Sequence, residues 1–195
     1  MFTGIIEATG LVDGTRWQGD IFEMTIRSDI SSFLHVDQSV SHDGVCLTVV
    51  GVSGDTHRVQ LVRETLERSH FKTIGTGSLI NLERAMPANG RFEGHFVQGH
   101  VDCEGEIVSI KDGIYSIRYP GAYAKYLTEK GSVSVNGVSL TVARLSEDVF
   151  GVAIIPYTLS HTNFRDLAPG SKVNLEFDML AKHIVRVIQL EGLTQ

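Results

Sequence analysis

The sequence predicts a mostly β protein, with two similar closed barrels in tandem and a single helix at the C-terminal end. An internal repeat covers most of the chain, and each copy contains short strand-like runs separated by Gly-containing turns. An amphipathic tail follows the second copy. The length of 195 residues is sufficient for two small hydrophobic cores.

The repeat forms a gapless register. Residues 40–83 align with residues 133–176 at an offset of 93, and 18 of these 44 positions are identical. Two pairs of glycines near the start of each copy match at an offset of 95, namely Gly4 with Gly99 and Gly10 with Gly105. We therefore expect a loop before residue 40 to absorb the two-residue difference. Because the period is too long for a solenoid unit, each copy is predicted to be a domain.

We expect the first barrel to span residues 1–88, the second residues 94–176, and the helix residues 178–191. Residues 21–26 and 114–118 alternate apolar and polar side chains, as half-buried strands do. Two runs rich in β-branched residues follow turns that tolerate positive φ, 45–52 after Asp43-Gly44 and 138–145 after Asn136-Gly137. Both patterns indicate hairpins.

Two helices are predicted. Residues 122–127 form one, which ends before Gly131. The tail forms the other, with Asp178 as its N-cap. Its apolar residues fall on one face, namely Leu180, Ile184, Val187 and Ile188. The first copy has no counterpart of this helix, which either packs on its own barrel or associates with other subunits, and we favour association.

Charge and cysteine content exclude several classes of protein. The 17 Lys and Arg against 23 Asp and Glu give a net charge of −6, without a basic run, which argues against a nucleic-acid partner. Cys46 and Cys103 make no disulfide framework. The start of the chain lacks signal-peptide features, and no run approaches the ~18 apolar residues of a membrane helix. We expect a cytoplasmic protein that binds a neutral small molecule or another protein.

Two histidines stand five residues apart in the segment 94–100. In a strand this spacing places His95 and His100 on opposite faces, so they are not expected to share a metal, and no zinc motif accompanies them. A lone histidine is usually structural or a surface residue. His100 is a stronger functional candidate because it replaces Ile5 of the first copy, so that a titratable side chain takes the place of an apolar one.

Cys46 and Ser139 occupy the same position of the repeat, and Thr48 and Thr141 follow two residues later on the same strand face. One interpretation is a pair of small buried residues; the other is a small polar group in each copy that faces a ligand. A hydrolase is discounted because no GxSxG elbow occurs. Phosphate-binding glycine loops of the nucleotide type are also absent.

Several segments together resemble one family. They are 1–6 (MFTGII), 44–49 (GVCLTV), 64–66 (ETL), 81–85 (NLERA), 94–102 (GHFVQGHVD), 136–142 (NGVSLTV) and 155–159 (IPYTL). In this order and spacing they resemble the riboflavin synthase family of the α-chain type, over about residues 1–187. The combination is highly specific.

The resemblance implies an all-β fold of two tandem Greek-key six-stranded β-barrels with a C-terminal α-helix, assembled as a homotrimer. It implies a dismutation in which one molecule of 6,7-dimethyl-8-ribityllumazine transfers a four-carbon unit to another. The products are riboflavin and 5-amino-6-(ribitylamino)pyrimidinedione, and neither cofactor nor metal is needed. The active sites would lie between the first barrel of one subunit and the second barrel of its neighbour, with one lumazine per barrel.

Site residues follow from the same resemblance. The first-barrel pocket would be lined by Gly4, Ile5, Ile6, Cys46, Leu47, Thr48 and a strand of Gln60, Leu61, Val62, Arg63, Glu64 and Thr65. The second-barrel pocket would be lined by Gly99, His100, Val101, Ser139, Leu140, Thr141, Ile155, Pro156, Tyr157, Thr158, Leu159 and Ser160, with Lys130 nearby. Phe2 would help to close the site. The catalytic candidates nearest proton transfer are Cys46, His100, Ser139 and Thr141.

The sequence departs from the family pattern at a few positions. Asp43 stands where Asn is common, Tyr157 where His is frequent, Cys103-Glu104 where Gly-Thr is usual, and Val185 where Glu is typical. The first rival hypothesis is a non-catalytic lumazine or flavin antenna protein, which would have lost polar residues that this sequence retains. The second is a flavin reductase domain. Such a domain would need a nicotinamide-binding partner domain, for which the chain has no room.

Overall fold

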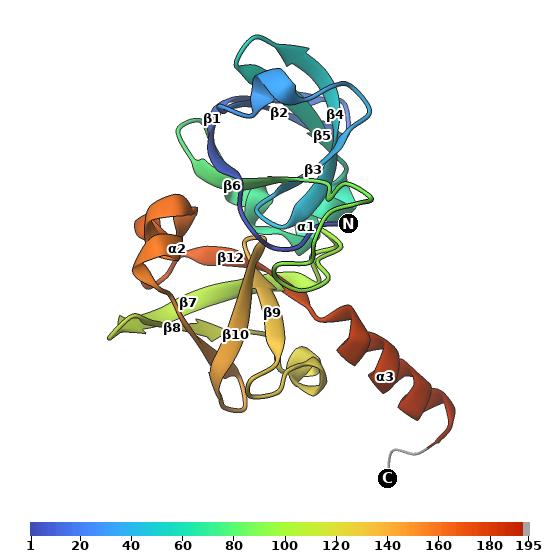
Figure 1. Cartoon of the computed structure of the whole chain (residues 1–195), viewed down its shortest axis with the longest axis vertical. Helices are drawn as coiled ribbons and strands as arrows, with labels where there is room; N and C mark the ends of the chain where they lie inside the picture. The colour runs from blue at the N-terminus through green and yellow to red at the C-terminus, as the bar shows by residue number, and fades with distance from the viewer. Residues whose placement is uncertain (193–195) are drawn as a thin grey trace.

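The computed structural model describes residues 1–192, and these fold into two closed antiparallel barrels of six strands each, followed by a helix (Figure 1). This confirms the fold class predicted from the sequence. The first barrel consists of β1 (Ala8–Gln18), β2 (Ile21–Arg27), β3 (Ser39–His42), β4 (Val45–Ser53), β5 (Thr56–Leu61) and β6 (Leu79–Arg84). The second consists of β7 (Cys103–Lys111), β8 (Ile114–Arg118), β9 (Ser132–Val135), β10 (Val138–Leu145), β11 (Val149–Ala153) and β12 (Lys172–Phe177).

The two barrels have the same strand order. In the first, β1 pairs with β2 and then the order continues β5, β4, β3, β6, back to β1. In the second, the equivalent order is β7, β8, β11, β10, β9, β12. Closure leaves no free sheet edge in either barrel. The repeat in the sequence is therefore a repeat of whole folding units.

Short helices connect the strands and one longer helix ends the chain. They are η1 (Ser31–Phe33), α1 (Arg63–Arg68), η2 (His70–Thr73), η3 (Gly121–Tyr126), α2 (Pro156–His161), η4 (Asn163–Asp166) and α3 (Met179–Leu190), where η marks a 3-10 helix. The helix predicted over 122–127 is thus a 3-10 turn. The strand expected over 60–65 is wrong, because β5 ends at Leu61 and α1 begins two residues later.

The two predicted hairpin turns are present and meet each other. Asp43 and Gly44 have φ values of 45° and 80°, and Asn136 and Gly137 have 47° and 79°. These turns join β3 to β4 and β9 to β10. A Cβ atom on Gly44 would lie 2.7 Å from the backbone nitrogen of Gly137, so only glycines allow the two turn tips to touch.

The residue offset that aligns the two copies changes at two places, in the first hairpin of each barrel and in the connection that follows it. Val12 and its partner Ile26 are 14 positions apart in the β1–β2 hairpin, whereas Ile107 and Ile117 are 10 positions apart in the β7–β8 hairpin. The first copy thus has the longer hairpin, and the second copy recovers two residues in the connection through η3. The single loop adjustment expected before residue 40 is corrected accordingly.

Each barrel encloses an apolar core, but the first also contains a buried polar chain. Ser31 Oγ lies 2.7 Å from His57 Nδ1, and His57 Nε2 lies 2.9 Å from His42 Nε2. All three residues are fully buried. The positions of His42 and His57 are taken in the second barrel by Val135 and Phe150, both part of its core. Burial lowers the pKa of His57 to about 4 and that of His42 to about 3.

Helix α3 extends away from the barrels (Figure 1). It begins as predicted, because the Asp178 carboxylate accepts a hydrogen bond of 2.8 Å from the backbone nitrogen of Leu180. Leu180, Ile184 and Val187 are 57%, 60% and 52% exposed, so the apolar face does not pack on the chain's own barrels. Within residues 1–192, no helix has the length and apolar character to span a membrane.

Candidate active site

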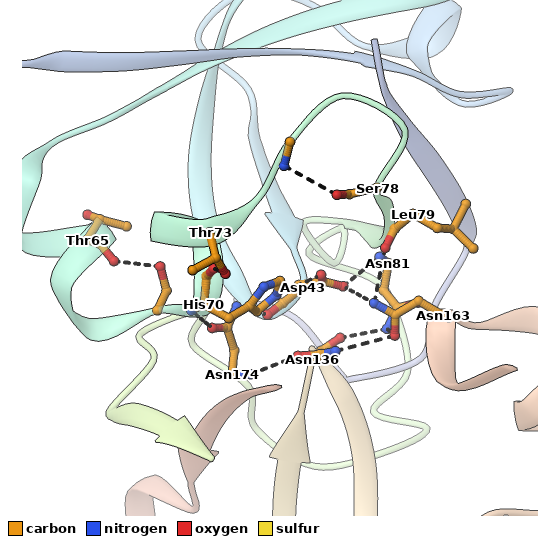
Figure 2. A network of polar contacts seen from close by, with 12 residues as sticks. Asp43, Thr65, His70, Thr73, Ser78, Leu79, Asn81, Asn136, Asn163 and Asn174 are labelled. Carbon is orange, nitrogen blue, oxygen red and sulfur yellow. Dashed lines mark hydrogen bonds and ion pairs between the residues drawn. The ribbon is translucent and has the colours of Figure 1, made fainter. Parts of the chain in front are cut away.

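A buried polar network joins the two barrels where the hairpin turns meet (Figure 2). The Asn81 side chain donates a 2.8 Å hydrogen bond to the Asn136 carbonyl, and the equivalent Asn174 side chain donates one of 2.9 Å to the Asp43 carbonyl. The two bonds are related by the internal repeat. The network therefore aligns the copies about a local pseudo-twofold axis.

The network differs between the copies at one pair. In the first copy, Asp43 Oδ2 lies 3.0 Å from His70 Nε2, while its Oδ1 accepts a hydrogen bond of 2.9 Å from the Asn163 side chain of the other barrel. In the second copy the repeat places Asn136 and Asn163 at these positions. Complete burial raises the pKa of Asp43, and its hydrogen bonds oppose that effect.

Two short segments cross between the barrels at this axis. The segment 2–6 lies against the second barrel, where the backbone nitrogen of Ser139 donates a 2.8 Å hydrogen bond to the Gly4 carbonyl. The segment 97–101 lies against the first barrel, where the backbone nitrogen of Cys46 donates a hydrogen bond of the same length, 2.8 Å, to the Gly99 carbonyl. Phe2 and Val97 pair with each other by two backbone bonds of 2.8 and 3.1 Å.

A buried glutamate holds each crossing segment. Glu83 accepts hydrogen bonds from the backbone nitrogens of Thr3 and Gly4, at 2.6 and 3.0 Å. Its repeat equivalent, Glu176, accepts bonds of 2.7 to 2.9 Å from three successive nitrogens, those of residues 98, 99 and 100. Burial raises the pKa of both glutamates, although the backbone donors stabilise their charged forms.

A cavity of about 520 Å³ lies beside the first barrel. It contains the Cys46 position, the start of α1 and the segment 98–102, and it extends to α3. Its lining residues are Val45, Cys46, Glu64, Thr65, Arg68, Gln98, Gly99, His100, Val101, Asp102, Met179, Lys182 and His183. This volume is within the range of small-molecule sites.

Charged groups at the rim of this cavity are paired. Lys182 contacts both carboxylate oxygens of Asp102, at 2.7 and 3.0 Å, and this ion pair ties α3 to the crossing segment. Arg68 and Glu64 form an ion pair of 3.2 Å along α1. The cavity thus offers a thiol, an imidazole from His100, and both donors and acceptors for a polar ligand.

The second barrel has an equivalent surface around Ser139. The repeat places Ser139, Tyr157 and Thr158 at the positions of Cys46, Glu64 and Thr65. Instead of an ion pair, α2 has the rings of Tyr157 and His161 stacked at 4.0 Å. Ser139 Oγ lies 2.7 Å from His95 Nδ1.

The crossing segments revise the predicted grouping of the site residues. Gly99, His100 and Val101 were expected at the second barrel, and Gly4, Ile5 and Ile6 at the first. The structure reverses this assignment, since Val101 packs on the core of the first barrel and Ile6 on that of the second. His100 therefore accompanies Cys46 and not Ser139. The physical cause is that each segment forms its backbone hydrogen bonds with the opposite copy.

The remaining predicted residues divide into three groups. Leu47 and Leu61 point into the core of the first barrel, and Phe2 is fully buried at the junction. The Gln60 and Arg63 side chains contact Glu23 and Asp20, away from the cavity, and Val62 is half exposed before α1. The exposed or partly exposed residues near the two sites are Thr48, Lys130, Leu140, Thr141, Ile155, Pro156, Leu159 and Ser160.

Sequence reasoning missed four contributors. Met179, Lys182 and His183 reach the first cavity from α3, for which the sequence pattern predicts packing on its own barrel or association with other subunits, but no part in a site. The fourth is His95, which the sequence pattern presents as a lone histidine of structural or surface type. Its position directly after Gly94, in a segment with a second histidine, was the available signal.

The sequence is similar to that of known proteins with a repeated domain. The sequence profile of the lumazine binding domain matches twice, over residues 3–85 and 98–178. A riboflavin synthase of Bacillus subtilis is 41% identical over 193 residues, covering 96% of this chain and 90% of that protein. A riboflavin synthase of Mycobacterium tuberculosis is 40% identical over 201 residues, covering 98% of this chain and all of that protein.

Solved structures match the fold. The crystal structure of LumP in complex with riboflavin has a TM-score of 0.83 and 24% identity, covering 91% of this chain and 99% of the other. The complex of LumP with 6,7-dimethyl-8-(1'-D-ribityl) lumazine has a TM-score of 0.80 and 22% identity, covering 90% of this chain and 98% of the other. At these identities the likeness establishes the fold alone. The sequence matches span nearly the whole length, and by them the chain belongs to the riboflavin synthase family of lumazine-binding barrel proteins.

Proposed function

We propose that the protein is a riboflavin synthase, which converts two molecules of 6,7-dimethyl-8-ribityllumazine into riboflavin and 5-amino-6-(ribitylamino)pyrimidinedione. The observation that carries the proposal is the pair of repeat-related sites at Cys46 and Ser139, in a chain about 40% identical to riboflavin synthases. Because the reaction consumes two identical molecules, two similar sites are the arrangement it requires. All atoms of the two substrates are found in the two products, so no cofactor is consumed.

The two sites are proposed to bind one lumazine each. At the first site, Cys46, Thr48, Glu64 and Thr65 would face the ligand together with the crossing segment 99–101. At the second, Ser139, Leu140, Thr141, Lys130 and the residues 155–160 would do so together with the segment 4–6. The backbone of each crossing segment is held by a buried glutamate, which supports a fixed hydrogen-bonding edge for the planar pyrimidine part of the ligand.

The proposed catalysis depends mainly on positioning. Holding two lumazine rings face to face replaces a bimolecular encounter, an effect that can supply on the order of 7–11 kcal/mol. The methyl group on the lumazine ring is acidic through its own electronics, so that the side chains need to supply only modest acid–base catalysis. Cys46 and His100 are the proposed proton-transfer groups at the first site, and Ser139 and Thr141 at the second.

The proposed assembly is a homotrimer in which the first barrel of one subunit faces the second barrel of its neighbour. The exposed apolar face of α3 supports association, because an exposed row of large apolar side chains is stabilised by a partner surface. Cys46 and Cys103 are free thiols, as a reducing compartment maintains, and we propose a cytoplasmic location.

The test is turnover of the purified protein with 6,7-dimethyl-8-ribityllumazine. We expect riboflavin fluorescence and the pyrimidinedione to increase together in a 1:1 ratio, with two lumazines consumed per riboflavin. Tight binding of lumazine without either product would contradict the proposal and favour an antenna protein.

A further inference from the structure

We propose that His95 is a positioning residue of the second site, where its Nδ1 accepts a hydrogen bond from the Ser139 hydroxyl and so directs the oxygen lone pairs of Ser139 toward the ligand. The inference rests on the proposed function and deepens it, because it gives the second site a hydroxyl paired with an imidazole, where the first site has the thiol of Cys46. It begins from the 2.7 Å separation of His95 Nδ1 and Ser139 Oγ. This is a short distance for a hydrogen bond between a nitrogen and a hydroxyl.

The backbone of His95 is fixed by the crossing segment. Its nitrogen donates a 3.1 Å hydrogen bond to the carbonyl of Thr3. Thr3 is held in turn by the buried Glu83 through both its backbone nitrogen and its hydroxyl, at 2.6 and 2.9 Å. The imidazole therefore projects from backbone that is hydrogen-bonded to Thr3, and Thr3 is in turn fixed by Glu83. This limits the freedom of the imidazole to move away from Ser139.

Ser139 packs closely against two glycines, Gly4 and Gly94. A Cβ on Gly4 would lie 2.6 Å from the Ser139 Cβ, and a Cβ on Gly94 would lie 2.9 Å from the same atom. Only glycines permit this approach, since real Cβ contacts are longer. The close packing restricts the positions available to the hydroxyl, which leaves the contact with His95 as a defined interaction.

The charge environment leaves His95 neutral and able to accept a hydrogen bond. Burial lowers the pKa of His95, while the carboxylate of Asp178 at the start of α3 opposes that effect. The imidazole is then neutral near pH 7, with one nitrogen as acceptor and the other carrying the proton. If Nδ1 accepts from Ser139, the proton resides on Nε2, and the serine oxygen has free lone pairs on its other side.

The first site has different groups around the equivalent position. Cys46 occupies the Ser139 position, and the imidazole that shares its cavity, His100, comes from a position equivalent to Ile5. The two lumazines would thus meet different groups, a thiol with one histidine and a hydroxyl with another. This difference can assign unequal roles to two identical substrates.

The experiment is a double-mutant cycle with Ser139, measured on the full-length protein. We expect His95→Phe to lower kcat at least tenfold with less than a twofold change in KM, and His95→Asn to restore part of the loss, because its side-chain oxygen can accept from Ser139. In a Ser139→Ala background, His95→Phe should change kcat less than twofold. The matched control is His35→Phe, since His35 is exposed in the first barrel and lies outside both sites.

Two outcomes would overturn the proposal. One is a full additional loss when His95→Phe is combined with Ser139→Ala, because the histidine would then not act through the serine. The other is an unchanged ¹⁵N chemical shift of His95 Nδ1 on Ser139→Ala, when loss of the hydroxyl should move it. The NMR measurement needs no turnover, so a failure of the proposed function, in which the wild type makes no riboflavin, remains distinguishable.

Discussion

The buried histidine pair of the first barrel should make the stability of the protein depend on pH. His42 and His57 are fully buried and hydrogen-bonded to each other, and burial lowers the pKa of both well below 6.5. The perturbation that tests this is the double variant His42→Val and His57→Phe, which installs the residues that the second barrel has at these positions. Since Val135 and Phe150 pack in an equivalent core, the variant is expected to fold.

The magnitude follows from the difference in proton binding. Between pH 6.5 and about 4 the unfolded chain protonates both imidazoles, while the folded barrel keeps them neutral. The unfolded state therefore binds more protons, and the free energy of unfolding falls as the pH falls. At pH 5, which is 1.5 pH units below the unfolded pKa, each histidine contributes a loss of about 2 kcal/mol relative to pH 7. The pair contributes about 4 kcal/mol.

The assay is urea unfolding at pH 7 and pH 5, followed by the fluorescence of Trp17, the one tryptophan of the chain. The difference between wild type and double variant should change by about 4 kcal/mol between the two pH values. Buried carboxyls such as Asp43 are common to both proteins and cancel in this difference. His35→Val, which removes an exposed histidine, should leave the wild-type pH dependence unchanged. Parallel pH curves for wild type and double variant would refute the reasoning.

Three further predictions concern the contacts between the two barrels and the apolar face of α3. Glu176→Gln should weaken lumazine binding at the first site about tenfold, measured by titration, because at least one backbone nitrogen loses its acceptor, whereas Glu106→Gln, at a partly exposed position, should not. Gly137→Ala should lower the free energy of unfolding by about 2 kcal/mol more than Gly54→Ala, because both have positive φ but only Gly137 meets another backbone; equal losses would contradict this. Ile184→Asp should shift the mass in light scattering toward monomer, with a cost of about 2 kcal/mol per interface, and an unchanged mass would exclude this face from the assembly.

The sequence predicted the fold because the relevant signals are local. The turns at Asp43-Gly44 and Asn136-Gly137 and the cap at Asp178 each depend on a few neighbouring residues, and all three are present. The crossing of segments 2–6 and 97–101 could not be predicted in this way. In a duplicated chain, a segment can form the same hydrogen bonds with its own copy or with the other copy. The repeat in the sequence is the same for both arrangements, so it does not distinguish them.

Two other features were missed for different reasons. His95 lies outside the gapless repeat of residues 40–83 and 133–176, so comparison of the copies over that repeat gives no contrast that marks it. The pair of His42 and His57 could have been found from the repeat, because both align with apolar residues of the second copy. A titratable residue aligned with a core residue is a signal for a buried polar group.

The crossing segments also bear on how such a chain could arise. A single-copy ancestor with the same contacts could complete its site only by borrowing a segment from a second molecule, so its activity would depend on its concentration. Fusion of two copies makes the exchange intramolecular, with an effective concentration set by the linker. Once both donors are encoded in one gene, each segment can change independently, as Ile5 and His100 have done.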